Sequence, residues 1–149
     1  MNQQAVSLTQ TMFPAMRYTD ARAAIAWLER AFDARRHVVY DAPDGTVAHA
    51  EIFIAGNLLM LGNTRDDGYA VRSPKDTGVV TASVYVVLPD AAAIDALHAR
   101  AAAAGATITD PPHDTDYGSH DFSAADLDGH LWSFGTYQPH DTPAHGEGA

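Results

Sequence analysis

Two parts of this chain repeat each other, and this internal repeat constrains the fold more than any other feature. Asp20 opens the first predicted helix and Asp90 opens the second, 70 residues later. Gly45 and Gly118 mark equivalent turns and lie 73 residues apart. The order strand, helix, strand, strand, strand occurs twice around these positions. Because units of this kind cover each other's apolar faces, the two halves are expected to share one core.

Hydrophobic periodicity separates the helices from the strands in both halves. Ile25, Leu28 and Phe32 recur at helical spacing behind the Asp20 cap. The first half is predicted to hold a strand at 11–18, a helix at 21–34 and strands at 36–40, 46–54 and 58–61. The second half is predicted to hold a strand at 79–88, a helix from 90 to Gly105 and strands at 106–109, 118–125 and 130–137. The pattern predicts an α+β fold in which two βαβββ units form a curved mixed sheet.

The length of 149 residues fits a single domain. We expect that domain to span residues 11–137, with one unit at about 11–62 and the other at about 79–137. The segment 62–75 between them is polar and rich in Gly and Pro, which predicts a loop. The tail 138–149 shows no packing pattern and is predicted to be disordered.

The charge balance narrows the possible partners. The chain has 19 acidic residues against 9 basic ones, a net charge of −10. Nucleic-acid binding relies on Lys and Arg neutralising phosphates, so this balance argues against nucleic acid and against an anionic membrane surface. The same charge favours a cationic ligand by long-range attraction, although acidity is also a common means of staying soluble.

Cysteine and targeting signals are missing from the sequence. The absence of cysteine excludes disulfides and thiolate metal sites. No apolar run approaches the roughly 18 residues of a membrane span, and the first four residues lack the basic start of a signal peptide. We therefore expect a cytoplasmic protein.

Two segments carry a family resemblance. The stretch Arg17–Ala21, continued by Ala24–Leu28 and Ala31-Phe32, is followed in the second half by Asp126–Phe134. They resemble the first strand and helix and the closing Asp-Pro-Asp-Gly hairpin of the vicinal oxygen chelate superfamily, with Leu127 in place of the usual Pro. This superfamily includes glyoxalases, extradiol dioxygenases, fosfomycin-modifying enzymes and bleomycin-binding proteins. The resemblance implies the glyoxalase/bleomycin-resistance fold and a homodimer, but one fold hosts many activities.

The resemblance also places four potential metal-ligand positions. Metal-dependent members take ligands from the first and last strand of each unit, which correspond here to Phe13, Met60, Ser83 and Ser133. The spacing between Phe13 and Ser83 is 70 residues and that between Met60 and Ser133 is 73, the same offsets as the repeat. None of the four is His, Asp or Glu, the usual ligands of Zn, Ni, Fe or Mn. We expect no metal and no other cofactor.

His49 and Glu51 are the best candidates for catalysis, because alternation along a strand places both on one face. They could act as a metal pair, as a base with its orienting carboxylate, or simply as the polar face of a half-exposed strand. His120 is a candidate third ligand, since the offset of 73 sets it opposite Val47. The turn residue His130 is expected to face solvent.

Without a metal, a concave sheet lined by apolar and aromatic groups remains, which is typical of a small-molecule site. The candidate ligand-binding residues are Phe13, Met60, Ser83, Tyr85, Tyr117, His120, Trp132 and Ser133. For each of them, packing in the core is the competing interpretation. The preferred hypothesis is a metal-free protein that sequesters a cationic or aromatic small molecule. The alternative is a metal-dependent or acid/base lyase, isomerase or dioxygenase with a non-standard site.

Overall fold

The computed structural model describes residues 10–141. The first unit contains β1 (Ala15–Tyr18), α1 (Ala21–Ala31), β2 (Arg35–Asp41), β3 (Val47–Ile54) and β4 (Asn57–Asn63). The second unit contains β5 (Ser83–Val87), α3 (Ala91–Ala103), β6 (Thr107–Asp114), β7 (His120–Ala125) and β8 (Leu131–Gly135). The short helix α2 (Pro74–Thr77) lies between the units and the 3-10 helix η1 (Pro139–Asp141) follows the second. Most of the tail predicted to be disordered, 142–149, lies outside the described residues.

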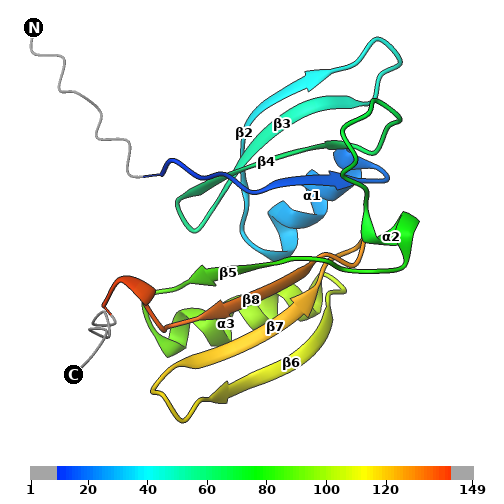
Figure 1. Cartoon of the computed structure of the whole chain (residues 1–149). Coiled ribbons are helices and arrows are strands. Elements are labelled where there is room, and N and C mark those ends of the chain that lie inside the picture. Colours follow the sequence, from blue (N-terminus) through cyan, green and yellow to red (C-terminus); the bar gives the residue numbers. More distant parts are fainter. Residues whose placement is uncertain (1–9, 142–149) are drawn as a thin grey trace, which may run out of the picture.

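The strands form two four-stranded mixed sheets of the same topology (Figure 1). Their orders are β1-β4-β3-β2 and β5-β8-β7-β6. Strand β1 runs parallel to β4, and β5 runs parallel to β8. All other neighbouring strands are antiparallel. Ala15 pairs with Met60 and Tyr85 pairs with Ser133, so the register reproduces the offsets of 70 and 73. The predicted α+β fold of two βαβββ units is confirmed, with the strands in two separate sheets.

Both long helices begin at the predicted aspartates. The side chain of Asp20 accepts from the Ala23 N–H at 3.1 Å, and Asp90 accepts from the Ala93 N–H at 2.8 Å. The first helix ends at Ala31, earlier than predicted, because Asp33 takes a positive φ of 56° that an α-helix does not accommodate. Within residues 10–141, no helix has the length and apolar character needed to cross a membrane.

Several other elements differ from the prediction, and β1, for example, begins at Ala15 rather than at residue 11. Strand β5 begins at Ser83 rather than at residue 79, because its partner β8 begins opposite it at Leu131. The helix α2, which was not predicted, starts at Pro74 behind the Ser73 cap. Strand β6 continues through Pro111 and Pro112, since it is an edge strand whose pairing with β7 shifts register around them.

The two units share one apolar core. Helix α1 lies between the two sheets, whereas α3 lies behind β7 and β8 (Figure 1). The ring of Phe32, at the end of α1, contacts Trp132 and Phe134 of the second sheet at centroid distances of 5.3 and 4.9 Å. Trp27 of α1 donates its indole N–H to the Ala104 carbonyl at 2.8 Å. The first helix therefore packs on both units.

A buried hydrogen-bond junction joins the β7–β8 hairpin to the first unit. Asp126 accepts from the Tyr18 hydroxyl at 2.7 Å and from the Trp132 indole at 3.0 Å. Asp128 accepts from the Thr19 N–H at 2.7 Å and from the Ser73 hydroxyl at 2.6 Å. Burial, and then the charge of Asp126, raise the pKa of the Tyr18 hydroxyl well above its usual value. Both carboxylates are paired, so they fix the position of the two units and of α2 at once.

Candidate functional site

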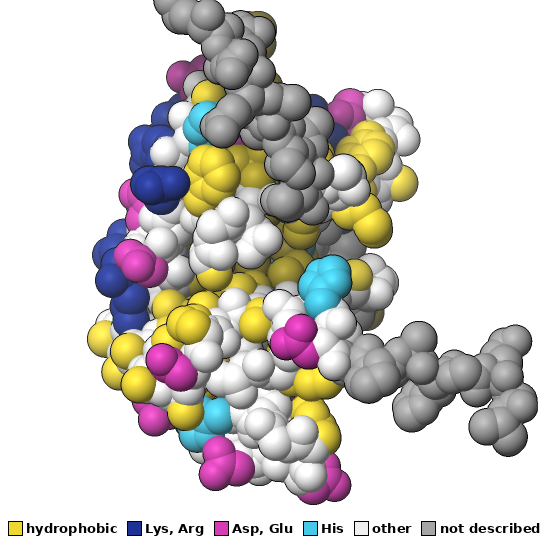
Figure 2. Space-filling view, turned by 90° about the vertical axis from the view of Figure 1, so that its left-hand side faces the viewer, with side chains coloured by type: hydrophobic (Ala, Val, Ile, Leu, Met, Phe, Trp, Pro, Cys, Tyr) yellow, Lys and Arg dark blue, Asp and Glu magenta, His cyan; other side chains and the backbone are white. Residues whose placement is uncertain are grey.

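A cavity lies between the inner edge strands of the two sheets, β1 and β5. It has a volume of about 790 Å³. Strand β1 pairs only with β4 and β5 pairs only with β8, so neither sheet fills the space between them. The linker between the units and α2 complete its wall. Figure 2 shows hydrophobic side chains gathered in the hollow between the two halves. A cavity of this size and character suits a small organic molecule.

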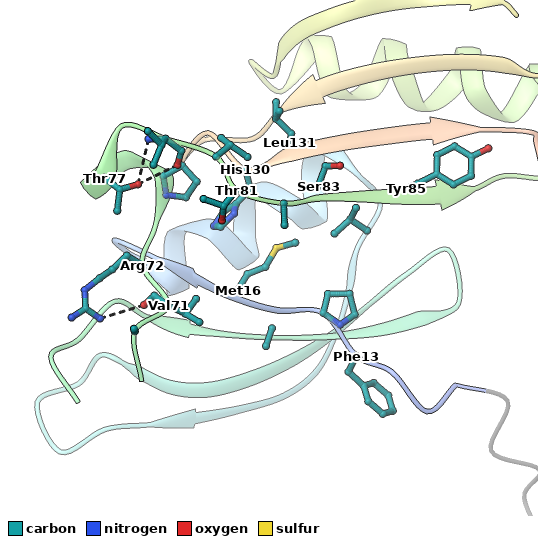
Figure 3. Close-up of a pocket in the computed structure, with 18 of the residues that line it drawn as sticks. Phe13, Met16, Val71, Arg72, Thr77, Thr81, Ser83, Tyr85, His130 and Leu131 are labelled. Carbon is teal, nitrogen blue, oxygen red and sulfur yellow. Dashed lines mark hydrogen bonds between the residues drawn. The ribbon is translucent and has the colours of Figure 1, made fainter. Parts of the chain in front are cut away.

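The two ends of this cavity differ in chemistry. Arg72 lies at one end and Tyr85 at the other, while Met16 reaches from β1 toward β5 in the middle (Figure 3). The Arg72 guanidinium is held by the Arg65 carbonyl at 3.0 Å and lies 3.6 Å from Asp66. The Tyr85 hydroxyl donates to the Tyr137 carbonyl at 2.7 Å, and burial raises its pKa. The linker end of the cavity therefore carries an arginine that neighbouring groups already hold, and the other end carries an aromatic ring.

His130 also lines the cavity and corrects the expectation of a solvent-facing turn residue. Its Nε2 donates to the Arg17 carbonyl at 2.8 Å, and its ring lies 4.8 Å from that of Tyr18. The sequence signal was its place directly after the Gly129 turn, which brings it back against the end of β1. The histidine thus belongs to the junction between the units as well as to the cavity wall.

A smaller hollow of about 320 Å³ lies on the open face of the first sheet and contains His49 and Met60. His49 Nε2 donates to Glu51 Oε1 at 3.1 Å, so the structure brings the predicted pair together. Two arginines border the hollow: Arg17 binds Asp67 through both nitrogens at 3.1 and 2.8 Å, and Arg65 contacts the same carboxylate. The Arg17 guanidinium holds the pKa of Asp67 well below its usual range. The hollow therefore carries charged groups of both signs.

The open face of the second sheet has different contents. Glu51 pairs with Met60 and Ser123 with Ser133, so strands β3 and β7 correspond at an offset of 72. The counterpart of His49 is therefore Asp121. Its carboxylate accepts from the Tyr117 hydroxyl at 3.3 Å and from the Ser119 hydroxyl. Sequence reasoning missed Asp121 because it used the offset of the turns, 73, for this strand too.

The predicted ligand-binding residues fall into three groups. Phe13, Ser83 and Tyr85 line the large cavity and Met60 lines the smaller hollow. Ser133 and Tyr117 line neither. Ser133 is 2.8 Å from the Ser123 hydroxyl on the same face, and Tyr117 joins Asp121.

Two predicted site residues lie elsewhere. Trp132 is 1% exposed and belongs to the shared core, as the competing interpretation held. His120 is turned toward α3 and the end of β6, where its two ring nitrogens contact Asp95 of α3 and Asp114 of β6, both at 2.7 Å. These hydrogen bonds raise its pKa. It therefore lies too far from the face of His49 to act as a third ligand, because a shift of one residue along β7 moves a side chain to the other face.

The chain does not fit the metal site that the family implies. The four ligand-equivalent positions offer a phenyl ring, a thioether and two hydroxyls, none of which binds a hard divalent ion well at neutral pH. Among residues 10–141, no three or more His, Asp or Glu side chains are grouped so that they could hold a metal ion. No step of a reaction is therefore derived through a metal.

Known proteins match both the sequence and the fold. The family model of the Glyoxalase/Bleomycin resistance protein/Dioxygenase superfamily matches residues 8–134. An uncharacterized protein of Mycobacterium bovis is 30% identical over 133 residues, which span 88% of this chain and 86% of that protein. The crystal structure of TioX from Micromonospora sp. ML1 is 30% identical, covers 85% of this chain and 94% of TioX, and has a TM-score of 0.67.

A more distant structure shares the fold alone. The fosfomycin resistance protein FosX from Listeria monocytogenes, complexed with Mn(II) and sulfate, is 12% identical, with a TM-score of 0.62. The structural match covers 89% of this chain and 96% of FosX. The repeated units, their register and these matches lead to one conclusion. The chain belongs to the glyoxalase/bleomycin resistance protein/dioxygenase superfamily.

Proposed function

We propose that this chain is a metal-free binding protein that holds a small organic molecule in the cavity between β1 and β5. The observation that carries the proposal is the cavity itself, about 790 Å³ and lined mainly by apolar side chains. Its volume is in the range of sites for drug-sized ligands. The lack of carboxylate or imidazole groups at Phe13, Met60, Ser83 and Ser133 supports binding without a metal.

Two measurements test this proposal. Metal analysis of the purified, dialysed protein should find less than one Zn, Ni, Fe or Mn per chain, and a stoichiometric metal would overturn the metal-free part. A thermal-shift screen of small molecules should find ligands that raise the melting midpoint by mass action. Ser83→Trp, which fills the cavity from an exposed strand position, should abolish those shifts. Thr107→Trp on the outer strand β6 is the matched control and should retain them.

A second candidate function rests on the contact between His49 and Glu51. A carboxylate 3.1 Å from an imidazole orients that ring, an arrangement suited to acid/base catalysis. The adjacent hollow of about 320 Å³ would hold only a small substrate. If the chain turns over any ligand from the screen, His49→Gln should abolish turnover and leave binding intact. Loss of both would argue for a structural role of His49.

We also propose that the chain forms a homodimer in the cytoplasm. An aromatic side chain on the open face of the first sheet supports the dimer, because Tyr40 is 60% exposed. Light scattering coupled to gel filtration should give about twice the mass of 15.9 kDa. A monomer at micromolar concentration would contradict it.

A further inference from the structure

Asp121 and three tyrosines lie close together at the Tyr85 end of the cavity. We call Tyr85, Tyr117, Tyr137 and Asp121 the tyrosine cluster. The ring of Tyr117 lies 5.7 Å from that of Tyr137, edge to face, and its hydroxyl donates to Asp121. Tyr85 donates to the Tyr137 carbonyl and also lines the cavity. The cluster is therefore continuous with the cavity rather than separate from it.

The strand beneath the cluster brings its members close together. A β-carbon on Gly135 would lie 2.3 Å from Asp121 Oδ1 and 2.5 Å from the Tyr85 hydroxyl. Both groups consequently occupy the space above Gly135 that a side chain would fill. The three rings nevertheless remain accessible, since Tyr85 is 39%, Tyr117 62% and Tyr137 37% exposed. Aromatic faces and a carboxylate are thus presented to solvent at one place.

The charge of Asp121 has no cationic partner among the residues that the structure describes. The ion pairs of residues 10–141 do not include it. Its two hydrogen bonds, from Ser119 and Tyr117, leave further acceptor sites on the carboxylate. The first sheet differs here, because Asp67 already binds Arg17 and Arg65. On the second sheet, Asp121 therefore keeps acceptor sites that a cation could use.

We propose that the tyrosine cluster binds the cationic head of the ligand, an alkylammonium or quaternary ammonium group, while its apolar body lies in the cavity. Aromatic faces attract ammonium groups through their quadrupole, and a nearby carboxylate adds a charge of the right sign. The net charge of −10 also favours the approach of a cation. This inference rests on the proposed small-molecule site and adds the class and orientation of its ligand.

Three probes with the same apolar tail test the inference: octyltrimethylammonium, octanol and octanesulfonate, each below its micelle concentration. Titration calorimetry on the full chain should show the cation binding about tenfold more tightly than octanol, and the anion binding most weakly. This order of affinities should persist in 0.5 M NaCl, because salt at that concentration screens long-range attraction but not a local contact.

Substitutions test whether the preference for the cation comes from the tyrosine cluster. Asp121→Asn should remove the tenfold preference for the cation and leave the affinity for octanol unchanged, and its melting midpoint reports whether it folds. Asp110→Asn, which removes the same charge from the outer strand β6, is the matched control and should keep the preference. Tyr117→Phe keeps the ring and should bind the cation as before, whereas Tyr117→Leu should lose about two- to fivefold.

The possible failures are distinct. Equal binding of all three probes would overturn the cationic head and retain the cavity. A preference for the cation that survives both Asp121→Asn and Tyr117→Leu would overturn the assignment to this cluster. A dimer in which the second copy covers the cluster and prevents binding would overturn it too. No binding by any of the three would overturn both this inference and the proposed function.

Discussion

The two units have the same topology, but their long helices differ in how many residues they bury. Helix α1 buries six residues from Ala21 to Ala31, including Ile25, Trp27 and Leu28, whereas α3 buries only Ile94 and Ala101. The reason is their position: α1 lies between the sheets and α3 covers one sheet from outside (Figure 1). A sequence repeat therefore preserves connectivity and register without preserving the share of the core that each copy supplies.

The open faces of the two sheets diverge in the same way. The first presents His49 beside Glu51 and two arginines, and the second presents Asp121 among tyrosines. Because open-face residues do not decide whether the sheet folds, they can differ between copies while the buried residues of the strands stay apolar. The repeated scaffold thus carries two faces of different chemistry.

The largest expected effect separates the two helices. Phe32→Ala should lower the free energy of unfolding by about 3–5 kcal/mol, because it removes a buried ring that contacts both units. Leu97→Ala on the half-buried face of α3 should lower it by about 1 kcal/mol. Urea unfolding of both variants measures this difference. Equal losses would show that α3 supplies as much of the core as α1.

The second effect concerns the two hairpins. Asp128→Ala should lower the free energy of unfolding by about 2–3 kcal/mol, because the Thr19 N–H and the Ser73 hydroxyl lose a buried acceptor. Its counterpart in the first unit is Ala55, which has a φ of 48°. Ala55→Asn should change stability by less than about 0.5 kcal/mol, since Asn tolerates that conformation. If Asp128→Ala left the free energy of unfolding unchanged, the hairpin would not hold the units together.

The third effect compares two equivalent glycines. A β-carbon at Gly62 would lie 2.9 Å from the Ala48 carbonyl oxygen, a backbone atom that moves only with its strand. Gly62→Ala should therefore cost about 1–3 kcal/mol. At Gly135 the close atoms are side-chain ends, so Gly135→Ala should cost less while displacing Asp121 and Tyr85. Thermal unfolding gives the stabilities, and a larger loss at Gly135 would contradict this order.

The smallest effect is a pH dependence. In the second unit the hydrogen bonds to Asp95 and Asp114 raise the pKa of His120, so the folded state holds this proton more tightly than the unfolded chain does. The stabilisation is complete below the ordinary histidine pKa of about 6.5 and is lost as pH rises through the raised value. In the first unit the lowered pKa of Asp67 gives the reverse, a contribution lost only in strong acid.

Unfolding midpoints measured across the pH range test this contrast. His120→Gln should reduce the decline in stability on the alkaline side and leave the acid side unchanged. Asp67→Asn should do the opposite. A decline on the alkaline side that is the same in His120→Gln as in the parent chain would remove His120 from the account.

The sequence predicted the fold well because local rules determine it. The caps Asp20 and Asp90, the Gly-containing turns and the strand alternation all act within a few residues, and the repeat then fixed how they pair. The residues of the site were harder to predict from the sequence. Whether Trp132 faces the core or a cavity depends on which face of β8 meets α1, and His120 lies opposite Asp95, 25 residues away. Such contacts follow from packing between distant segments, which no periodicity reports.

The linker between the units forms much of the cavity wall, and this has a consequence for how such a protein changes. About half of the cavity-lining side chains, among them Val71, Thr77 and Val80, belong to the linker between β4 and β5. Substitutions there would alter the shape of the binding space without disturbing strand pairing or the shared core. Ligand preference is consequently separable from folding in this architecture, and new specificities can arise by variation of one short connecting segment.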